Sequence, residues 1–319
     1  ANVDSIFMYS WLISLLAGNP NIVRVSQNIS PQFLFLLEVL AATIEDFGEE
    51  ISGRIVILTY PHESHISSLL SQSCFARVVW GGNSTVATVR SIPLRPTAVE
   101  MCFPDRFSAS VMRSEEILII PDIELSNLVV NFCNDAFWFA QQACSSPKML
   151  AWVGSPDACS IAKERFWSAV RLQVAINQTE NSSAMAMSRL NIIYQYAARE
   201  FAYPVDKDNT AIFPSRVELE GSITSQVKEL HAGNGMFLES SYESLQVLAG
   251  ELSDKEQTLG IYGFSRDECL MFLDALPQRS VDRLVPIGSA LEFDYVWDGV
   301  DLFQFFTRKI SIPNRQLLR

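Results

Sequence analysis

The chain has 319 residues, of which 48% are hydrophobic and 19% are charged. A chain of this length and composition forms about two domains with ample apolar cores, which argues against an intrinsically disordered protein. The 24 basic and 36 acidic residues give a formal net charge of -12, and no basic stripe interrupts the sequence. The composition therefore also argues against a broad nucleic-acid-binding surface.

The cysteines and histidines indicate a reduced protein without a metal site. The six cysteines form no CxxC pair, and no cysteine and histidine cluster has zinc spacing. His62 and His65 are three residues apart, but no carboxylate or cysteine pattern completes a ligand set around them. Scattered thiols of this kind are typical of a cytoplasmic protein, which is the location we expect.

The apolar run near the start of the chain does not predict a membrane segment. Residues 6–17 are interrupted by Tyr9, Ser10 and Ser14 and are too short to cross a bilayer. The run also lacks the basic flank of a signal peptide. Because the sequence begins at Ala1, already inside an apolar element, we expect that an N-terminal portion is missing from it.

Strand and helix patterns alternate through the first half of the chain. The sequence predicts helices over residues 5–16, 32–43, 63–72 and 84–92. It predicts strands over residues 21–26, 54–60, 76–80, 97–103 and 108–112. Strands and helices in turn are typical of an α/β fold with a Rossmann-type parallel sheet.

A second region begins near residue 115. Leu128, Phe132, Ala136 and Ala140 recur every four residues, as on one face of a helix, and this helix leads to Cys144. A strand over 149–154, helices over 156–173 and 184–201, and a mixed α/β remainder are expected to follow. We therefore place a segment boundary at residue 115.

The first candidate site follows the strand NIVRVS. Arg24 ends the strand, and Ser26 and Gln27 come next. Ligands of doubly wound sheets bind at the carboxyl ends of the strands, so Arg24 is a candidate for contact with a nucleotide phosphate or ribose. An ordinary solvated arginine explains the same pattern.

The second candidate site is the turn in VVWGGNSTV. A strand stops at Gly81 and Gly82, and a helix begins at Asn83 or Ser84. The amides at a helix N-terminus bind phosphate well. A strand-to-helix turn needs glycine in any case, so the turn alone leaves a purely structural role open.

The third candidate is Cys144, at the end of the helix pattern in FAQQACSSP. A buried cysteine is most often an inert apolar residue, and the other five cysteines lie within apolar or helical patterns that fit this role. Cys144 differs because it lies at a Ser-Ser-Pro break, where a chain can present a side chain to a cleft. Reactive thiols need a positive neighbour or aligned amides, and Lys148 is close in sequence.

These segments resemble a known enzyme group. NVDSIFMYSWLISLLAGNPNIVRVS, WGGNSTV and QQACSSP resemble motifs of the aldehyde dehydrogenase superfamily. YPHES, the WGG turn and VDRLVPIGSALEFDYVWDGVDL are similar to motifs of one branch, the LuxC-type long-chain acyl-CoA reductases of bacteria. The resemblance runs from about residue 1 to residue 310, and members of the family are normally longer at the N-terminus.

The resemblance implies an aldehyde dehydrogenase-like fold with named parts. Residues 1–115 would form the dinucleotide-binding domain without its N-terminal portion, and residues 116–295 the catalytic cysteine domain. Residues 296–319 would form a C-terminal return and oligomerisation segment. Cys144 would accept the acyl group as a thioester, and Asn2 and the Cys144 amide would donate to the oxyanion.

The resemblance also implies a nicotinamide cofactor. Its phosphates and adenosine ribose would contact Arg24, Ser26, Gln27, Gly81, Gly82, Ser84 and Thr85. Relatives that prefer NAD often have glutamate at the place of Gln27. A neutral glutamine removes the repulsion of a 2'-phosphate, so we expect NADPH, with NADH as the alternative.

The predicted function is reduction of acyl-CoA, or another acyl thioester, to a fatty aldehyde. Hydrolytic aldehyde dehydrogenases use the glutamate of a Glu-Leu-Gly-Gly-Lys motif to activate water, whereas the matching region here reads VEMCFPDRFSAS. Glu100 in this region leaves a hydrolytic dehydrogenase as one alternative. A non-catalytic subunit of a multienzyme complex is another, and we expect a homo-oligomer or such a complex.

Overall fold

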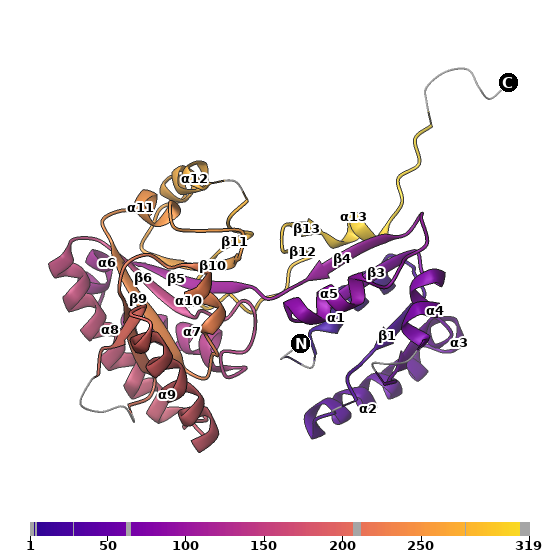
Figure 1. Cartoon of the computed structure of the whole chain (residues 1–319), viewed down its shortest axis with the longest axis horizontal. Helices are drawn as coiled ribbons and strands as arrows, with labels where there is room; N and C mark the ends of the chain where they lie inside the picture. Colours follow the sequence, from indigo (N-terminus) through magenta and orange to yellow (C-terminus); the bar gives the residue numbers. More distant parts are fainter. Residues whose placement is uncertain are drawn as a thin grey trace. The chain divides into compact units, whose positions relative to one another are not determined.

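The computed structural model describes residues 3, 5–27, 29–61, 65–206, 212–277 and 279–312. The chain divides into two compact units, which Figure 1 shows from indigo to yellow along the sequence. The first contains Val3–Pro104 and the chain from Phe293 onward, and the second contains Asp105–Glu292. The change of unit at Pro104 comes earlier than the boundary expected at residue 115, because residues 107–113 form a central strand of the second unit.

The first unit contains two short parallel sheets, β1 with β2 and β3 with β4. Its elements are α1 (Phe7–Leu16), β1 (Asn21–Arg24), α2 (Pro31–Asp46), α3 (Glu49–Ser52), β2 (Ile55–Leu58), α4 (Ile66–Ser73), β3 (Ala76–Trp80), α5 (Asn83–Arg90), β4 (Val99–Phe103), β12 (Val296–Trp297), β13 (Val300–Asp301) and α13 (Leu302–Phe306). The C-terminal elements join this unit because the Tyr9 ring stacks on Phe293 and Asn19 donates to the Phe306 carbonyl at 3.0 Å. Residues 296–306 thus complete the unit that the N-terminal half begins.

The second unit is built on one sheet with strand order β11-β10-β5-β6-β9-β8-β7, parallel except for β7. Its elements are β5 (Phe107–Arg113), α6 (Ser114–Ile119), α7 (Asp122–Phe137), β6 (Met149–Val153), α8 (Pro156–Ile176), α9 (Ser183–Ala198), β7 (Ala202–Pro204), β8 (Ser215–Leu219), α10 (Ser225–Leu230), β9 (Met236–Tyr242), α11 (Leu245–Ala249), β10 (Glu256–Tyr262), α12 (Arg266–Ala275) and β11 (Arg283–Pro286). The α/β fold with parallel sheets that the sequence predicts is confirmed.

Helices cover both faces of this sheet, so its central strands are apolar on both sides. All five side chains of β6 are buried, and they alternate between two cores. Met149 and Ala151 face the core formed with α9–α12, whereas Leu150 and Trp152 face the core formed with α6–α8. The continuous apolar run MLAWV therefore packs against the helices on both faces of the sheet.

The helix expected to pass through Ala140 ends earlier. α7 stops at Phe137, and Ala140 has a left-handed backbone with φ 49°. The Ala140 N–H donates to the Phe137 carbonyl at 3.0 Å, which closes a turn instead of continuing the helix. No helix within the described ranges has the length and apolar character needed to cross a membrane.

A buried ion pair joins β8 to β9 under two tryptophans. Arg216 Nε donates to Glu239 Oε2 at 2.8 Å, and the indoles of Trp152 and Trp167 donate to Glu239 Oε1 at 2.9 and 2.6 Å. Glu239 is fully buried, so every one of these donors offsets the loss of its hydration. Arg216 also pairs with Glu164, whose side chain is 63% exposed.

We expect Arg216→Met to lower the free energy of unfolding by about 3–5 kcal/mol, because it leaves the Glu239 carboxylate buried without its cation. Glu164→Gln is the matched control, because it removes the charge of the exposed partner of the same arginine. We expect it to lower the free energy of unfolding by less than about 1 kcal/mol. Urea denaturation followed by circular dichroism measures both changes. Equal losses for the two variants would contradict the assigned difference.

Candidate active site

Cys144 lies in the segment that connects α7 to β6, directly before the amino end of the sheet. Its side chain is partly buried and belongs to neither core, whereas Cys133 and Cys159 are core residues. The backbone is left-handed at Ala140 and Gln141, with φ of 49° and 62°. These two residues reverse the chain after α7, and the segment then runs past the amino ends of the strands to β6.

Two glutamines ahead of Cys144 fix this segment. The fully buried Gln141 amide donates to the Pro147 carbonyl at 2.8 Å and to the Met236 carbonyl at 2.9 Å, and it accepts from the Gly235 N–H at 2.9 Å. Gln142 donates to the Ala232 carbonyl at 2.9 Å. The two amides tie residues 140–147 to the loop before β9. The two glutamines stand directly before the cysteine in the sequence, but no local pattern predicts this role for them.

The loop before β9, to which Gln141 and Gln142 are hydrogen-bonded, contains two glycines that its conformation requires. Gly233 and Gly235 have φ of 72° and 79°, a region that other residues rarely adopt. A Cβ at Gly233 would lie 2.6 Å from Gln142 Nε2, and one at Gly235 would lie 2.3 Å from the Phe213 ring. Both positions therefore require glycine for a close approach as well as for the backbone angle.

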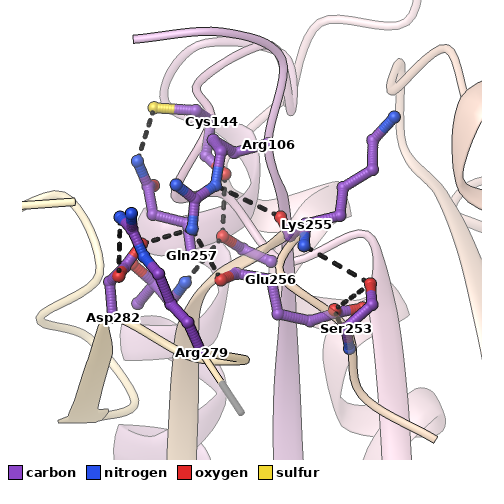
Figure 2. A network of polar contacts seen from close by, with 10 residues as sticks. Arg106, Cys144, Ser253, Lys255, Glu256, Gln257, Arg279 and Asp282 are labelled. Atoms are coloured by element: carbon purple, nitrogen blue, oxygen red, sulfur yellow. Dashed lines mark hydrogen bonds and ion pairs between the residues drawn. The ribbon is translucent and has the colours of Figure 1, made fainter. Parts of the chain in front are cut away.

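Residues at the amino ends of β5 and β10 contact Cys144 directly. The Ser108 hydroxyl donates to the Cys144 carbonyl at 2.7 Å, and Gln257 Nε2 donates to Cys144 Sγ at 3.4 Å. Figure 2 shows the Gln257 amide directed at the sulfur. Both side chains are fully buried, so the contacts hold Cys144 from the interior of the sheet.

Lys148 supplies a positive charge to the same segment. Its Nζ lies 3.4 Å from the Arg106 carbonyl and 5.9 Å from the centroid of the Phe107 ring. Burial lowers the pKa of Lys148, whereas negative charge on Cys144 and Asp105 opposes that shift. A thiolate at Cys144 and an ammonium at Lys148 therefore stabilise each other, which is the setting that reactive cysteines need.

The histidine nearest to this segment has a structural role. Burial lowers the pKa of His231 to about 3, and the charge of Lys148 acts in the same direction. His231 Nδ1 accepts from the Gly233 N–H at 3.0 Å, and Nε2 lies 3.1 Å from the Met236 carbonyl. The neutral ring thus supports the loop before β9. Across the described parts of the chain, no three His, Cys, Asp or Glu side chains are placed to hold a metal ion.

In the first unit, the predicted nucleotide contacts follow the carboxyl end of β1. The Arg24 guanidinium donates to the Tyr60 carbonyl at 3.2 Å and lies 5.4 Å from the centroid of the Tyr60 ring. Ser26 and Gln27 come next and are exposed. A cation and two exposed polar side chains at a strand end fit the polar parts of a nucleotide.

The glycine turn lies between β3 and α5, as the sequence predicts. A Cβ at Gly81 would lie 2.9 Å from Thr85 Cγ2, so the turn and the first helical turn approach closely. Gly82 is the N-cap of α5 and has no side chain to cap it, and Ser84 and Thr85 are exposed in the first turn. Main-chain N–H groups and two hydroxyls at this end of α5 fit a phosphate group.

The sequence also offers Asn2 and Glu100 as candidate catalytic residues. Asn2 lies outside the described residues. Glu100 on β4 is paired with two arginines of its own unit: Arg77 Nε donates to it at 2.7 Å, and Arg90 Nε lies 3.5 Å away. These two charges bind the carboxylate that a hydrolytic enzyme would need as a base.

A cavity of about 340 Å³ opens at the other end of the sheet, where β6 and β9 finish. Lys163 and Arg216 line it, and both cations pair with Glu218 or Glu164 on the same wall. Because these charges are already matched, the cavity offers no clear selectivity for a charged ligand. Cys144 lies at the amino end of the strands and is not among the residues that line this cavity.

Structural comparison identifies the fold. The chain resembles AldH from Staphylococcus aureus (TM-score 0.62, 12% identity, 97% of this chain and 69% of that chain). It also resembles aldehyde dehydrogenase 21 from Physcomitrella patens (TM-score 0.66, 12% identity, 93% of this chain and 62% of that chain). A third similar structure is an indole-3-acetaldehyde dehydrogenase in complex with NAD+ (TM-score 0.65, 11% identity, 95% of this chain and 64% of that chain). The chain thus spans about two thirds of the length of each of these proteins. None of the curated proteins compared with the chain matches it in sequence.

Comparison with protein families identifies the relationship within this fold. The sequence model of the LuxC acyl-CoA reductases matches residues 1–180, which include the glycine turn and Cys144. The match covers more than half of the 319 residues. The chain therefore belongs to the LuxC acyl-CoA reductase family.

Proposed function

We propose that this protein reduces an acyl thioester such as a long-chain acyl-CoA to the aldehyde, with Cys144 as the residue that carries the acyl group. The observation that carries the proposal is the setting of the thiol. Cys144 Sγ accepts an N–H from Gln257 at 3.4 Å, and its charge is coupled to Lys148. Membership of the LuxC family supports the same reaction class.

In the first half of the reaction, Cys144 Sγ attacks the carbonyl carbon of the substrate thioester. The bond from this carbon to the sulfur of coenzyme A breaks, coenzyme A leaves as a thiolate that takes a proton from solvent, and the acyl group remains on Cys144. The N–H of Cys144 would donate to the oxyanion of the tetrahedral intermediate, and such a donor contributes about 3 kcal/mol to the transition state. Asn2 as a second donor stays a prediction.

In the second half, bound NADPH supplies a hydride for the carbonyl carbon of the acyl group. The bond to Cys144 Sγ then breaks, and the aldehyde leaves. Cys144 returns as a thiolate, which the Lys148 charge and the Gln257 N–H stabilise for the next cycle. Covalent capture thus divides one difficult reduction into two easier steps.

The arrangement favours reduction over hydrolysis of the acyl group. A hydrolytic enzyme needs a carboxylate that activates water, and Glu100 is the candidate that the sequence offers. Its carboxylate is bound by Arg77 and Arg90 of the same unit, so these partners occupy it. A role as a non-catalytic subunit would instead leave Cys144 unreactive. We propose a cytoplasmic enzyme that works as a homo-oligomer or within a multienzyme complex.

The preference for NADPH is proposed from the end of β1. The Arg24 guanidinium favours an additional phosphate, and Gln27 places no negative charge near it. Gly81, Gly82, Ser84 and Thr85 would hold the pyrophosphate at the start of α5.

Incubation of the full-length protein with a long-chain acyl-CoA is expected to add one acyl group to the wild type and none to Cys144→Ala, as measured by intact mass. Cys269→Ala is the matched control, because this thiol is also partly buried, and it should be acylated like the wild type. An acyl group on Cys144→Ala, or an unmodified wild type, would contradict the role of Cys144.

Gln27→Glu is expected to lower kcat/KM for NADPH at least about tenfold and to change kcat/KM for NADH much less. A carboxylate beside the 2'-phosphate adds repulsion, and about 1.4 kcal/mol corresponds to tenfold. The oxidation of each cofactor at 340 nm measures both constants. Gln32→Glu, an exposed change in the same unit, should leave the ratio unaltered. Equal losses with both cofactors for Gln27→Glu would show that Gln27 does not select the phosphate.

A further inference from the structure

The start of β10 is unusually polar for a strand inside a sheet. Glu256, Gln257 and Thr258 are consecutive and at most 1% exposed. Burying a polar side chain costs free energy unless it finds a partner. Gln257 is the member of this run whose amide N–H reaches Cys144 Sγ, at 3.4 Å. The burial of Gln257 therefore directs a neutral hydrogen-bond donor at the reactive atom.

The main chain around Gln257 is held from both neighbouring strands. Arg106, before β5, donates to the carbonyls of Glu256 at 2.8 Å and Lys255 at 3.3 Å. The same guanidinium forms a buried ion pair with Asp282, before β11, and the Asp282 N–H donates to the Gln257 carbonyl at 3.1 Å. Figure 2 shows this chain of contacts from Arg279 and Asp282 to Cys144. The position of the Gln257 backbone is thus fixed by a charge pair between the segments that precede β5 and β11.

The neighbouring charge is neutralised elsewhere. The Glu256 carboxylate, which precedes Gln257 in the strand, is bound by other groups. Glu256 forms a buried ion pair with Lys228 and accepts from the Ser253 N–H at 2.8 Å. The face of β10 that meets Cys144 therefore presents an amide rather than a carboxylate.

We infer that Gln257 is a catalytic residue whose amide N–H holds the Cys144 thiolate in the position for attack and stabilises it again when the aldehyde leaves. This inference rests on the proposed function, because it takes Cys144 as the nucleophile. An N–H bonds a thiolate more strongly than a thiol or a thioester sulfur, since a charged acceptor strengthens the bond. Gln257 thus favours the two states of the cycle in which the sulfur carries charge.

The test is the rate at which iodoacetamide alkylates Cys144 in the full-length protein, followed by peptide mass between pH 6 and pH 10. Gln257→Met keeps the size of the side chain and removes the donor, and Gln257→Glu keeps the shape and replaces the donor with a carboxylate. At pH 7 we expect alkylation about tenfold slower for Gln257→Met and slower still for Gln257→Glu. The rates of both variants should recover towards the wild-type rate at pH 10.

Thr258→Val is the matched control on the same strand. Its buried hydroxyl has no hydrogen-bond partner among the described residues, so valine removes a polar group of the run without touching the sulfur. It should be alkylated at the wild-type rate at every pH. Wild-type profiles for both Gln257 variants would overturn the inference, as would an equal slowing in Thr258→Val. If Gln257→Met fails to fold by circular dichroism, the profile of Gln257→Glu decides.

The experiment separates this inference from the proposed function, because alkylation needs no acyl group. Slow alkylation of the Gln257 variants, with no acylation of the wild type by acyl-CoA, would support the role of Gln257 at the Cys144 sulfur and would contradict the proposed reduction of acyl-CoA. Acylation of the Gln257 variants at the wild-type rate would overturn the role of Gln257 and leave the reaction in place.

Discussion

The position of Cys144 depends on the buried amide of Gln141. This amide uses both donors and its acceptor on main-chain groups that flank the reactive segment and begin β9. A buried amide that lost these partners would cost free energy, so the segment has one favourable path along the sheet edge. On this path Ser108 and Gln257 contact Cys144. The position of the thiol thus depends on the packing of a neutral side chain.

Parallel strands bring the remaining groups to the same edge. β5, β6 and β10 are neighbours and run in one direction, so Ser108, Lys148 and Gln257 all precede or begin their strands on one side of the sheet. Main-chain and ion-pair contacts through Arg106 and Asp282 hold two of these strands in register at that edge. The sheet is packed between apolar cores on both faces, and Ser108 and Gln257 contact Cys144 from its interior.

Local patterns in the sequence predict much of this arrangement. The alternation of strands and helices predicts the parallel sheets. The expectation that the helix leads directly to Cys144 is wrong, because α7 ends at Phe137 and Cys144 lies in the connection to β6. Local patterns do not predict the contact between Cys144 and Gln257, because 113 residues separate the two side chains. The contact also depends on the strand order, in which β10 lies beside β5 and not beside β9. Ala140 was expected on the helix face for a related reason: its spacing fits, but the turn formed with Phe137 ends the helix first. Sequence periodicity describes one element at a time, whereas the site is formed by strands that meet only in the folded sheet.

The measurement that tests the central claim most directly is a single turnover followed by rapid quenching and intact mass. The protein is first acylated with a long-chain acyl-CoA, excess substrate is removed, and NADPH is added. Our account predicts that the acyl group leaves Cys144 at the rate at which aldehyde appears, and that this rate is at least as fast as steady-state turnover. An acyl group that stays on the protein while aldehyde forms, or that leaves as a carboxylic acid, would contradict it.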